Sequence, residues 1–157
     1  MKKLYIQNLV LVITEKCNFN CRHCIRGNGY NINMSDSMFK QIFGEVKGIN
    51  NLIISGGEPL LEKDRLLSLL NSLKENGVVL EQYGLTTNGT LYDEEIESIF
   101  DQYEAYVSSV ALNDSSRINE KYHGYIDLSE DEFHHEEIMK NEKLRQNYFD
   151  NISKLKQ

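Results

Sequence analysis

Three aliphatic segments, each followed by a segment with helical spacing, constrain the fold of this chain most. The aliphatic segments cover Leu9–Thr14, Asn51–Ser55 and residues 78–85. Uninterrupted runs of β-branched and aliphatic residues are typical of parallel strands that are buried on both faces. Strands that alternate with helices across short loops form right-handed βαβ units. The pattern therefore predicts an α/β fold with a mainly parallel sheet.

The segments between these strands have the end signals of helices. Ser35 is predicted to cap the first helix, and Asp93 the third. Gly77 follows the last apolar residue of the second helix and is predicted to end it in a left-handed conformation. We expect short connections between all of these elements.

The pattern weakens after Leu112. Tyr106–Leu112 is predicted to be a fourth strand, and Tyr125–Ser129 is a candidate for another short strand. Residues 130–137 are rich in carboxylates and are interpreted as a solvated acidic loop. The apolar residues spaced along 138–157 indicate a terminal amphipathic helix.

The length and the charge limit the class of protein. With 157 residues the chain is expected to form one domain, with its motifs in residues 9–112 and the acidic loop and terminal helix in 113–157. A formal net charge of −7 argues against a nucleic-acid-binding face. No stretch approaches the length of a membrane span, and no signal-peptide cleavage pattern follows the start of the chain, so a cytoplasmic location is expected.

The cysteines of the chain lie together directly after the first strand. Cys17, Cys21 and Cys24 form a C-x3-C-x2-C loop and are the only cysteines. A cubane cluster of four irons takes four thiolates, so three leave one iron with an open position for chemistry. Zinc held by these thiols and His23 is the alternative, although structural zinc sites usually have two C-x2-C pairs. An odd number of cysteines disfavours a disulfide interpretation.

Two further motifs follow the second and third strands. Gly56-Gly57-Glu58 ends the second strand, and Thr87-Asn88-Gly89 ends the third. Functional groups of parallel sheets collect at the carboxyl ends of the strands, so we expect both motifs to lie beside the cysteine loop. Glycines allow a backbone to approach a ligand closely, and a carboxylate accepts hydrogen bonds from an ammonium group. Both motifs are also ordinary turn sequences.

Together, these motifs resemble the radical S-adenosylmethionine (SAM) enzymes over residues 9 to about 112. The resemblance implies a partial (β/α) barrel, a [4Fe–4S] cluster on the three cysteines and SAM on the open iron. It implies that Gly56-Gly57-Glu58 holds the amino group of SAM and that His23, which occupies an aromatic position of the family motif, lies near the adenine. The cofactor-binding residues implied in this way are His23, Gly56, Gly57, Glu58, Thr87, Asn88 and Asn113.

The resemblance also implies an activity. Reductive cleavage of SAM would give methionine and a 5′-deoxyadenosyl radical, which would abstract hydrogen from a peptide, protein or nucleotide-like substrate. A reductant such as flavodoxin or ferredoxin is implied, and a protein partner or substrate is expected to cover the open barrel. The family barrel has six strands, whereas four are evident here. The alternatives are a protein like the glycyl-radical activases, a non-catalytic binding or inhibitory protein, for instance from a phage or mobile element, and a truncated reading frame.

The acidic segment has a second interpretation. Asp131-Glu-Phe-His134 is similar to the end of the fourth strand in some relatives, which would place Asp131 and His134 on the substrate side and would require Tyr106–Leu112 to be reassigned. A second metal site built from the histidines and carboxylates of this segment is a further alternative, although no spacing supports it.

Overall fold

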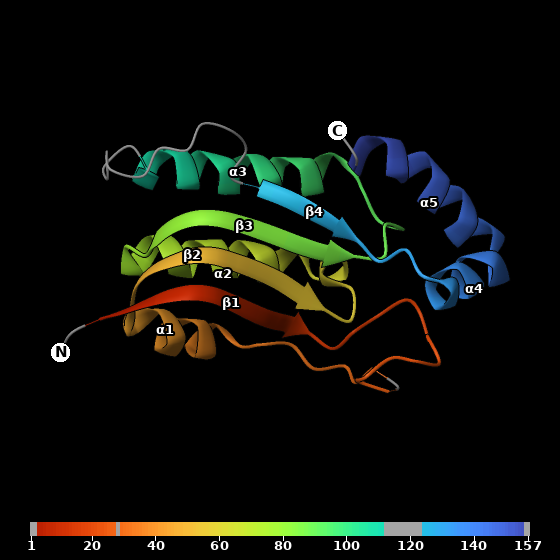
Figure 1. Cartoon of the computed structure of the whole chain (residues 1–157), viewed down its shortest axis with the longest axis horizontal. Helices are drawn as coiled ribbons and strands as arrows, with labels where there is room; N and C mark the ends of the chain where they lie inside the picture. Colours follow the sequence, from red (N-terminus) through yellow and green to blue (C-terminus); the bar gives the residue numbers. More distant parts are fainter. Residues whose placement is uncertain (1–2, 28, 112–123, 156–157) are drawn as a thin grey trace.

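The computed structural model of the chain describes residues 3–27, 29–111 and 124–155. Within these residues, four strands form one parallel sheet in the order β1-β2-β3-β4 (Figure 1). The elements in chain order are β1 (Leu4–Thr14), α1 (Asp36–Gly44), β2 (Val46–Gly56), the short 3-10 helix η1 (Pro59–Leu61), α2 (Lys63–Asn76), β3 (Val79–Thr87), α3 (Glu94–Ala111), β4 (Gly124–Leu128), α4 (Glu132–Lys140) and α5 (Glu142–Leu155).

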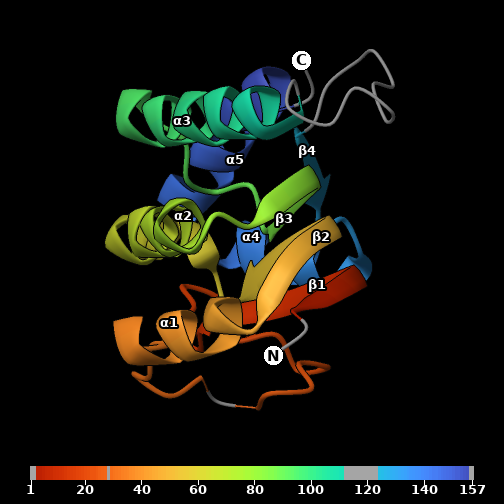
Figure 2. The ribbon, with the colours of Figure 1, turned by 90° about the vertical axis from the view of Figure 1, so that its left-hand side faces the viewer.

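The helices α1, α2 and α3 cover one face of the sheet (Figure 2). The core lies between these helices and the strands, where side chains such as Leu52, Leu66 and Leu70 are completely buried. Each aliphatic side chain buried in this way contributes about 1.5–3 kcal/mol to the free energy of folding. This arrangement confirms the predicted α/β fold with a parallel sheet, open in the manner of a partial (β/α) barrel.

The predicted helix ends are confirmed. Ser35 accepts a hydrogen bond from the Met38 amide at 3.3 Å, and Asp93 accepts one from the Ile96 amide at 2.9 Å. Gly77 has a φ of 61°, the left-handed conformation expected for a residue that ends a helix. Local signals were sufficient at these three positions because each cap is formed by neighbouring residues.

The predicted strand over Tyr106–Leu112 is wrong in its described part, because α3 continues through Ala111. The hydroxyl of Tyr106 donates to the Val78 carbonyl at 2.5 Å, and that of Tyr103 donates to the Leu66 carbonyl at 2.7 Å. Aromatic and β-branched residues favour strands only weakly on their own. Here they continue the helical face that packs on the sheet and on α2, and this packing decides the conformation.

The sheet gains its fourth strand from β4, the candidate segment after residue 124. The prediction of an acidic loop over 130–137 is also wrong, because α4 begins at Glu132. The Asp131 carboxylate caps α4 by accepting hydrogen bonds from the Phe133 and His134 amides, at 3.0 and 2.9 Å. The expected terminal helix is divided at Asn141, whose extended backbone ends α4 and whose side chain accepts from the Lys143 amide to begin α5.

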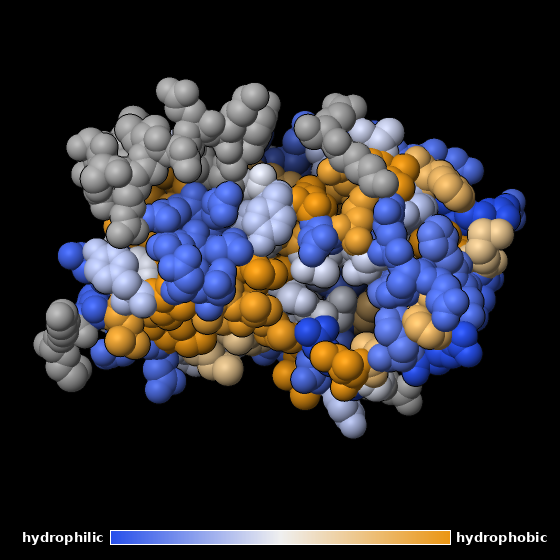
Figure 3. Space-filling model, in the orientation of Figure 1, coloured by the Kyte–Doolittle hydropathy of each residue, from blue (hydrophilic) through white to orange (hydrophobic). Residues whose placement is uncertain are grey.

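The second face of the sheet is not covered by α1, α2 or α3. Figure 3 shows hydrophobic residues gathered over β1 and β2 on this face, and Val10 is 56% exposed there. The ring of Tyr125 lies over Gly84, and its hydroxyl is 3.2 Å from the side-chain amide nitrogen of Asn51. None of the described helices combines the length and the apolar character needed to cross a membrane.

Candidate functional site

A cavity of about 220 Å³ lies at the carboxyl ends of the strands and brings the predicted motifs together. The predicted residues that line it are Cys17, Cys21, Cys24, His23, Gly56, Gly57, Thr87 and Asn88. Glu58 lies behind the cavity wall, and Asn113 is outside the described residues. Residues separated by seventy positions in the sequence therefore form one site, as expected for the strand ends of a parallel sheet.

The loop that carries the cysteines is folded by short backbone contacts. The Cys24 amide donates to the Cys21 carbonyl at 3.0 Å, which closes a turn between these two thiols. The Phe19 amide lies 3.4 Å from the Cys17 sulfur. The ring of Phe19 is buried in a small cluster with Ile138 of α4, and this contact anchors the loop on the C-terminal helices.

The surroundings of Cys17 and Cys21 disfavour the thiolate forms of these two side chains. Desolvation by neighbouring atoms raises the pKa of the Cys17 thiol, although the residue as a whole is exposed. Burial, together with the negative charge of Glu137 and the other two thiolates, raises the pKa of Cys21 to about 11. A thiol with such a pKa holds its proton until a cation stabilises the thiolate, and metal binding then releases the proton. Three free thiols that line one cavity are a donor set that fits an iron–sulfur cluster with one open iron.

The glycine motif forms another wall of the cavity. Its backbone lies unusually close to the backbone of the segment that precedes the cysteine loop. The Gly57 amide donates to the Thr14 carbonyl at 2.8 Å, and the Glu58 amide donates to the Lys16 carbonyl at 2.7 Å. A Cβ atom on Gly57 would lie only 2.2 Å from the Lys16 carbonyl oxygen. Glycine is required here by the contact with the segment that leads into Cys17.

Arg26 is a cavity residue that sequence reasoning missed. Its guanidinium donates a hydrogen bond to the Gly56 carbonyl, and it is the only Arg or Lys among the described residues that line the cavity. The Gly56 carbonyl is thus accessible to a cationic donor from inside the cavity. The only signal in the sequence was the position of Arg26, two residues after the last cysteine.

Glu58 links the ends of β2 and β3 through hydrogen bonds of its side chain, which lies outside the cavity. One carboxylate oxygen accepts hydrogen bonds from the Leu60 amide at 3.0 Å and from the Thr87 hydroxyl at 2.8 Å. The other oxygen accepts from the Asn88 amide at 2.8 Å. The side chain is completely buried, and this burial raises its pKa to about 7. Its carboxylate is used to hold the two motifs in place.

Asn88 continues this connection to the cysteine loop. Its side-chain amide donates to the Asn18 side-chain oxygen at 2.8 Å, and Asn18 in turn donates to the Thr90 hydroxyl at 2.8 Å. Since Asn18 follows Cys17 directly, the third strand end fixes the position of the first cysteine. Asn18 also gave no recognisable signal in the sequence.

From the buried side chain of Glu58 we predict how the free energy of unfolding depends on pH. Its pKa is about 7 in the folded chain and near 4.5 in the unfolded chain, so the folded state binds the additional proton between these values. The free energy of unfolding should therefore fall as the pH rises from 5 to 8, by roughly 2–3 kcal/mol from this group. Glu58→Gln should remove this pH dependence. It should also lower stability at pH 5, because the side-chain NH₂ group of Gln is itself a donor and would face a backbone amide or hydroxyl donor.

Urea unfolding at a series of pH values measures this effect. Glu75→Gln, on the exposed surface of α2, is the matched control and should keep the pH dependence of the unaltered chain. Identical pH profiles for Glu58→Gln and the unaltered chain would contradict the prediction.

Comparison with known proteins gives one family. The Radical SAM superfamily model matches residues 11–157. The chain is 36% identical over 112 residues to a probable GTP 3′,8-cyclase of Methanococcus aeolicus, a match that covers 64% of this chain and 36% of the relative. It is 34% identical over 110 residues to a GTP 3′,8-cyclase of Staphylococcus saprophyticus, covering 61% of this chain and 31% of that protein. The chain thus spans about a third of the length of these curated relatives.

A solved structure has a similar fold. The structure of anSMEcpe with bound AdoMet and a Cp18Cys peptide superposes with a TM-score of 0.54 at 20% sequence identity, covering 98% of this chain and 41% of that one. At this identity, the likeness concerns the fold alone. Radical SAM proteins use a [4Fe–4S] cluster and S-adenosylmethionine, and they generally need a reductant.

Proposed function

This chain belongs to the radical SAM superfamily, and we propose that it binds a [4Fe–4S] cluster through Cys17, Cys21 and Cys24 and cleaves SAM reductively. The observation that carries this proposal is the meeting of all three thiols with the Gly56-Gly57 backbone at one cavity. When bound, the cluster and SAM supply a 5′-deoxyadenosyl radical that abstracts hydrogen from a substrate. The protein binds and orients the two groups.

The residues of the cavity wall have distinct roles in this proposal. The Gly56 carbonyl already accepts a hydrogen bond from a cationic group, so it is suited to accept one from the amino group of SAM. Arg26 is then free to pair with the carboxylate of SAM. His23 lies beside Cys24 and presents a ring to the cavity, which suits a contact with adenine.

Glu58, Thr87 and Asn88 support this wall. Glu58 acts as a positioning residue because its carboxylate contacts only protein donors among the described residues. Thr87 and Asn88 line the cavity while bonded to Glu58 and Asn18, so they hold the strand ends in register. These contacts connect the strand ends that line the cavity to the cysteine loop.

The open face of the sheet is the proposed place for the substrate. Val10, Ile53, Gly84 and Tyr125 are paired neighbours on the four successive strands and cross this face. The face continues along the strands to the cavity at their carboxyl ends. The similarity to GTP 3′,8-cyclases supports a nucleotide-like substrate, with a peptide or protein as the other candidate. Flavodoxin or ferredoxin is the proposed reductant.

The direct test is anaerobic reconstitution with iron and sulfide, followed by reduction and addition of SAM. We expect about four irons per chain and the formation of 5′-deoxyadenosine, measured by chromatography. A cluster without SAM cleavage would favour the non-catalytic binding role instead. A chain that binds no iron would contradict the proposal.

A further inference from the structure

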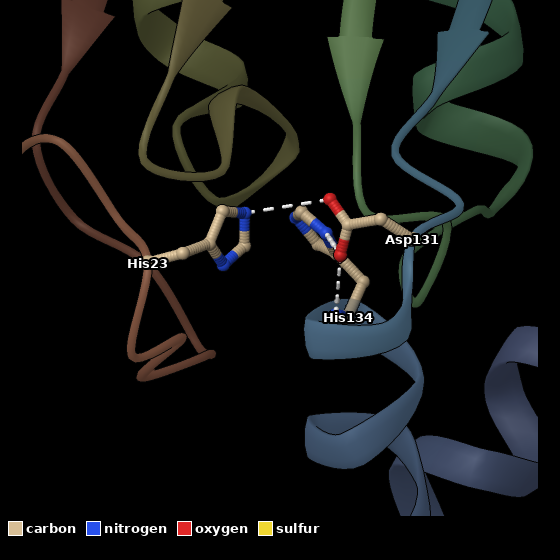
Figure 4. A group of neighbouring side chains, drawn as sticks. All are labelled: His23, Asp131 and His134. Carbon is tan, nitrogen blue, oxygen red and sulfur yellow. Dashed lines mark hydrogen bonds and ion pairs between the residues drawn. The ribbon is translucent and has the colours of Figure 1, made fainter.

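Three side chains that are far apart in the sequence converge at the rim of the cavity. His23 comes from the cysteine loop, whereas Asp131 and His134 come from the beginning of α4 (Figure 4). The Nε2 atom of His23 is 3.4 Å from Oδ2 of Asp131, and Nδ1 of His134 is 2.8 Å from Oδ1 of Asp131. One potential ligand atom from each of the three residues lies within 4.8 Å of the other two.

The three side chains are held in place by their neighbours. Oδ1 of Asp131 caps α4 through the Phe133 and His134 amides, which fixes the carboxylate plane and leaves Oδ2 directed toward His23. The His23 ring stacks on Phe133 with a centroid distance of 4.3 Å. The His134 ring lies 6.1 Å from that of Phe19 and is mostly buried. Little side-chain entropy is therefore lost when a ligand draws these groups together.

We propose that His23, Asp131 and His134 form a binding site for a divalent transition-metal ion such as Zn²⁺, separate from the cysteine site. The ion would bind Nε2 at the edge of the His23 ring, which leaves the ring face that does not stack on Phe133 for the contact with adenine. Two imidazoles and a carboxylate are an N₂O donor set that Zn²⁺ and related ions accept. Bonds of about 2.0–2.1 Å in a tetrahedral site place ligand atoms about 3.3 Å apart. The separation of 3.4 Å between Nε2 of His23 and Oδ2 of Asp131 agrees with this value. The 2.8 Å between Nδ1 of His134 and Oδ1 of Asp131 is a direct hydrogen bond, so His134 must turn away from this contact to bind the ion.

The site leaves a fourth ligand position open. His23 and His134 line the cavity in which the cysteines and the glycine motif meet, whereas Asp131 lies outside that lining. A metal ion here would also join the cysteine loop to α4, in addition to the pairing of Arg22 with Glu136 at 3.0 Å. Binding would therefore stabilise the docking of the C-terminal helices on the cysteine loop.

Titration with Co²⁺ tests the site without interference from the thiols. The background is the full chain with Cys17→Ser, Cys21→Ser and Cys24→Ser, because this variant retains the three proposed ligands. We expect it to bind one Co²⁺ per chain, with visible d–d absorption and no thiolate-to-metal charge-transfer band, and to release Co²⁺ when Zn²⁺ is added. Because this variant has no cluster ligands, the result does not depend on the proposed SAM chemistry.

Two substitutions in this background identify the ligands. Asp131→Asn preserves the helix cap, since Asn caps helices about as well as Asp, but it removes the charge. His134→Ala removes a proposed ligand, and His135→Ala is the matched control, since its ring contacts Tyr148 instead. We expect at least a tenfold loss of Co²⁺ affinity for the first two substitutions and none for the third. Absence of the visible bands, or equal affinity in all three variants with intact circular dichroism, would overturn the proposal.

Discussion

Cys24→Ala is expected to abolish the iron–sulfur cluster and the formation of 5′-deoxyadenosine. The chain has three cysteines, and all of them line one cavity, so no other thiolate of this chain can replace the lost ligand. Loss of an outer partner of a metal ligand alone typically costs 10–100-fold in affinity or activity. Loss of the ligand itself should therefore lower SAM cleavage by more than about 100-fold.

The measurement is iron and sulfide content after anaerobic reconstitution, with product formation assayed on the same samples. Asn20→Ala is the control, because Asn20 lies beside Cys21 in the same loop while its side chain is exposed and outside the cavity lining. It should retain both the cluster and the activity. If Cys24→Ala also retained SAM cleavage, the assignment of the cysteine loop as the cluster site would be wrong.

The sequence predicted those parts of the site that depend on local pattern. Aliphatic runs identified the first three strands, and the parallel topology then required that the motifs after them share one edge of the sheet. Cys17, Gly57 and Thr87 could be assigned to one site in this way, without any knowledge of distances. This inference was reliable because strand ends are ordered by the fold itself.

Other features depend on contacts that no local pattern records. The segment after Tyr106 has residues that suit a strand or a helix, and its packing on the sheet and on α2 decides between them. Glu58 was predicted to bind a ligand, and this prediction is untested; its complete burial and its three protein donors became evident only in three dimensions. His23 and Asp131 are more than a hundred positions apart, so their proximity gave no spacing signal.

Hydrogen bonds connect the segments that line the cavity to one another. The Gly57 amide is bonded to the end of β1, Glu58 to Thr87 and Asn88 at the end of β3, and Asn88 to Asn18 beside the first cysteine. A change in any one of these contacts should therefore displace the cysteine loop. The tightest contact is the best place to test this dependence.

Gly57→Ala is expected to destabilise the chain and to impair cluster assembly. The new Cβ atom would lie 2.2 Å from the Lys16 carbonyl oxygen and 2.7 Å from that of Glu15. Both are backbone atoms, so the glycine loop and the segment before Cys17 must separate. Forcing a methyl group into such a contact costs about 1–3 kcal/mol, and the Gly57–Thr14 hydrogen bond would be strained as well.

Urea unfolding and iron content measure the two effects separately. Gly44→Ala is the matched control, because nothing lies within 4 Å of the position of its new Cβ atom. Since Gly44 is the last residue of α1, this control should be neutral or more stable by up to about 1 kcal/mol. A Gly57→Ala chain with unchanged stability and full iron content would show that the close backbone approach is not needed. Reduced iron content in a chain that still unfolds cooperatively would instead show that this contact sets the position of the cysteine loop.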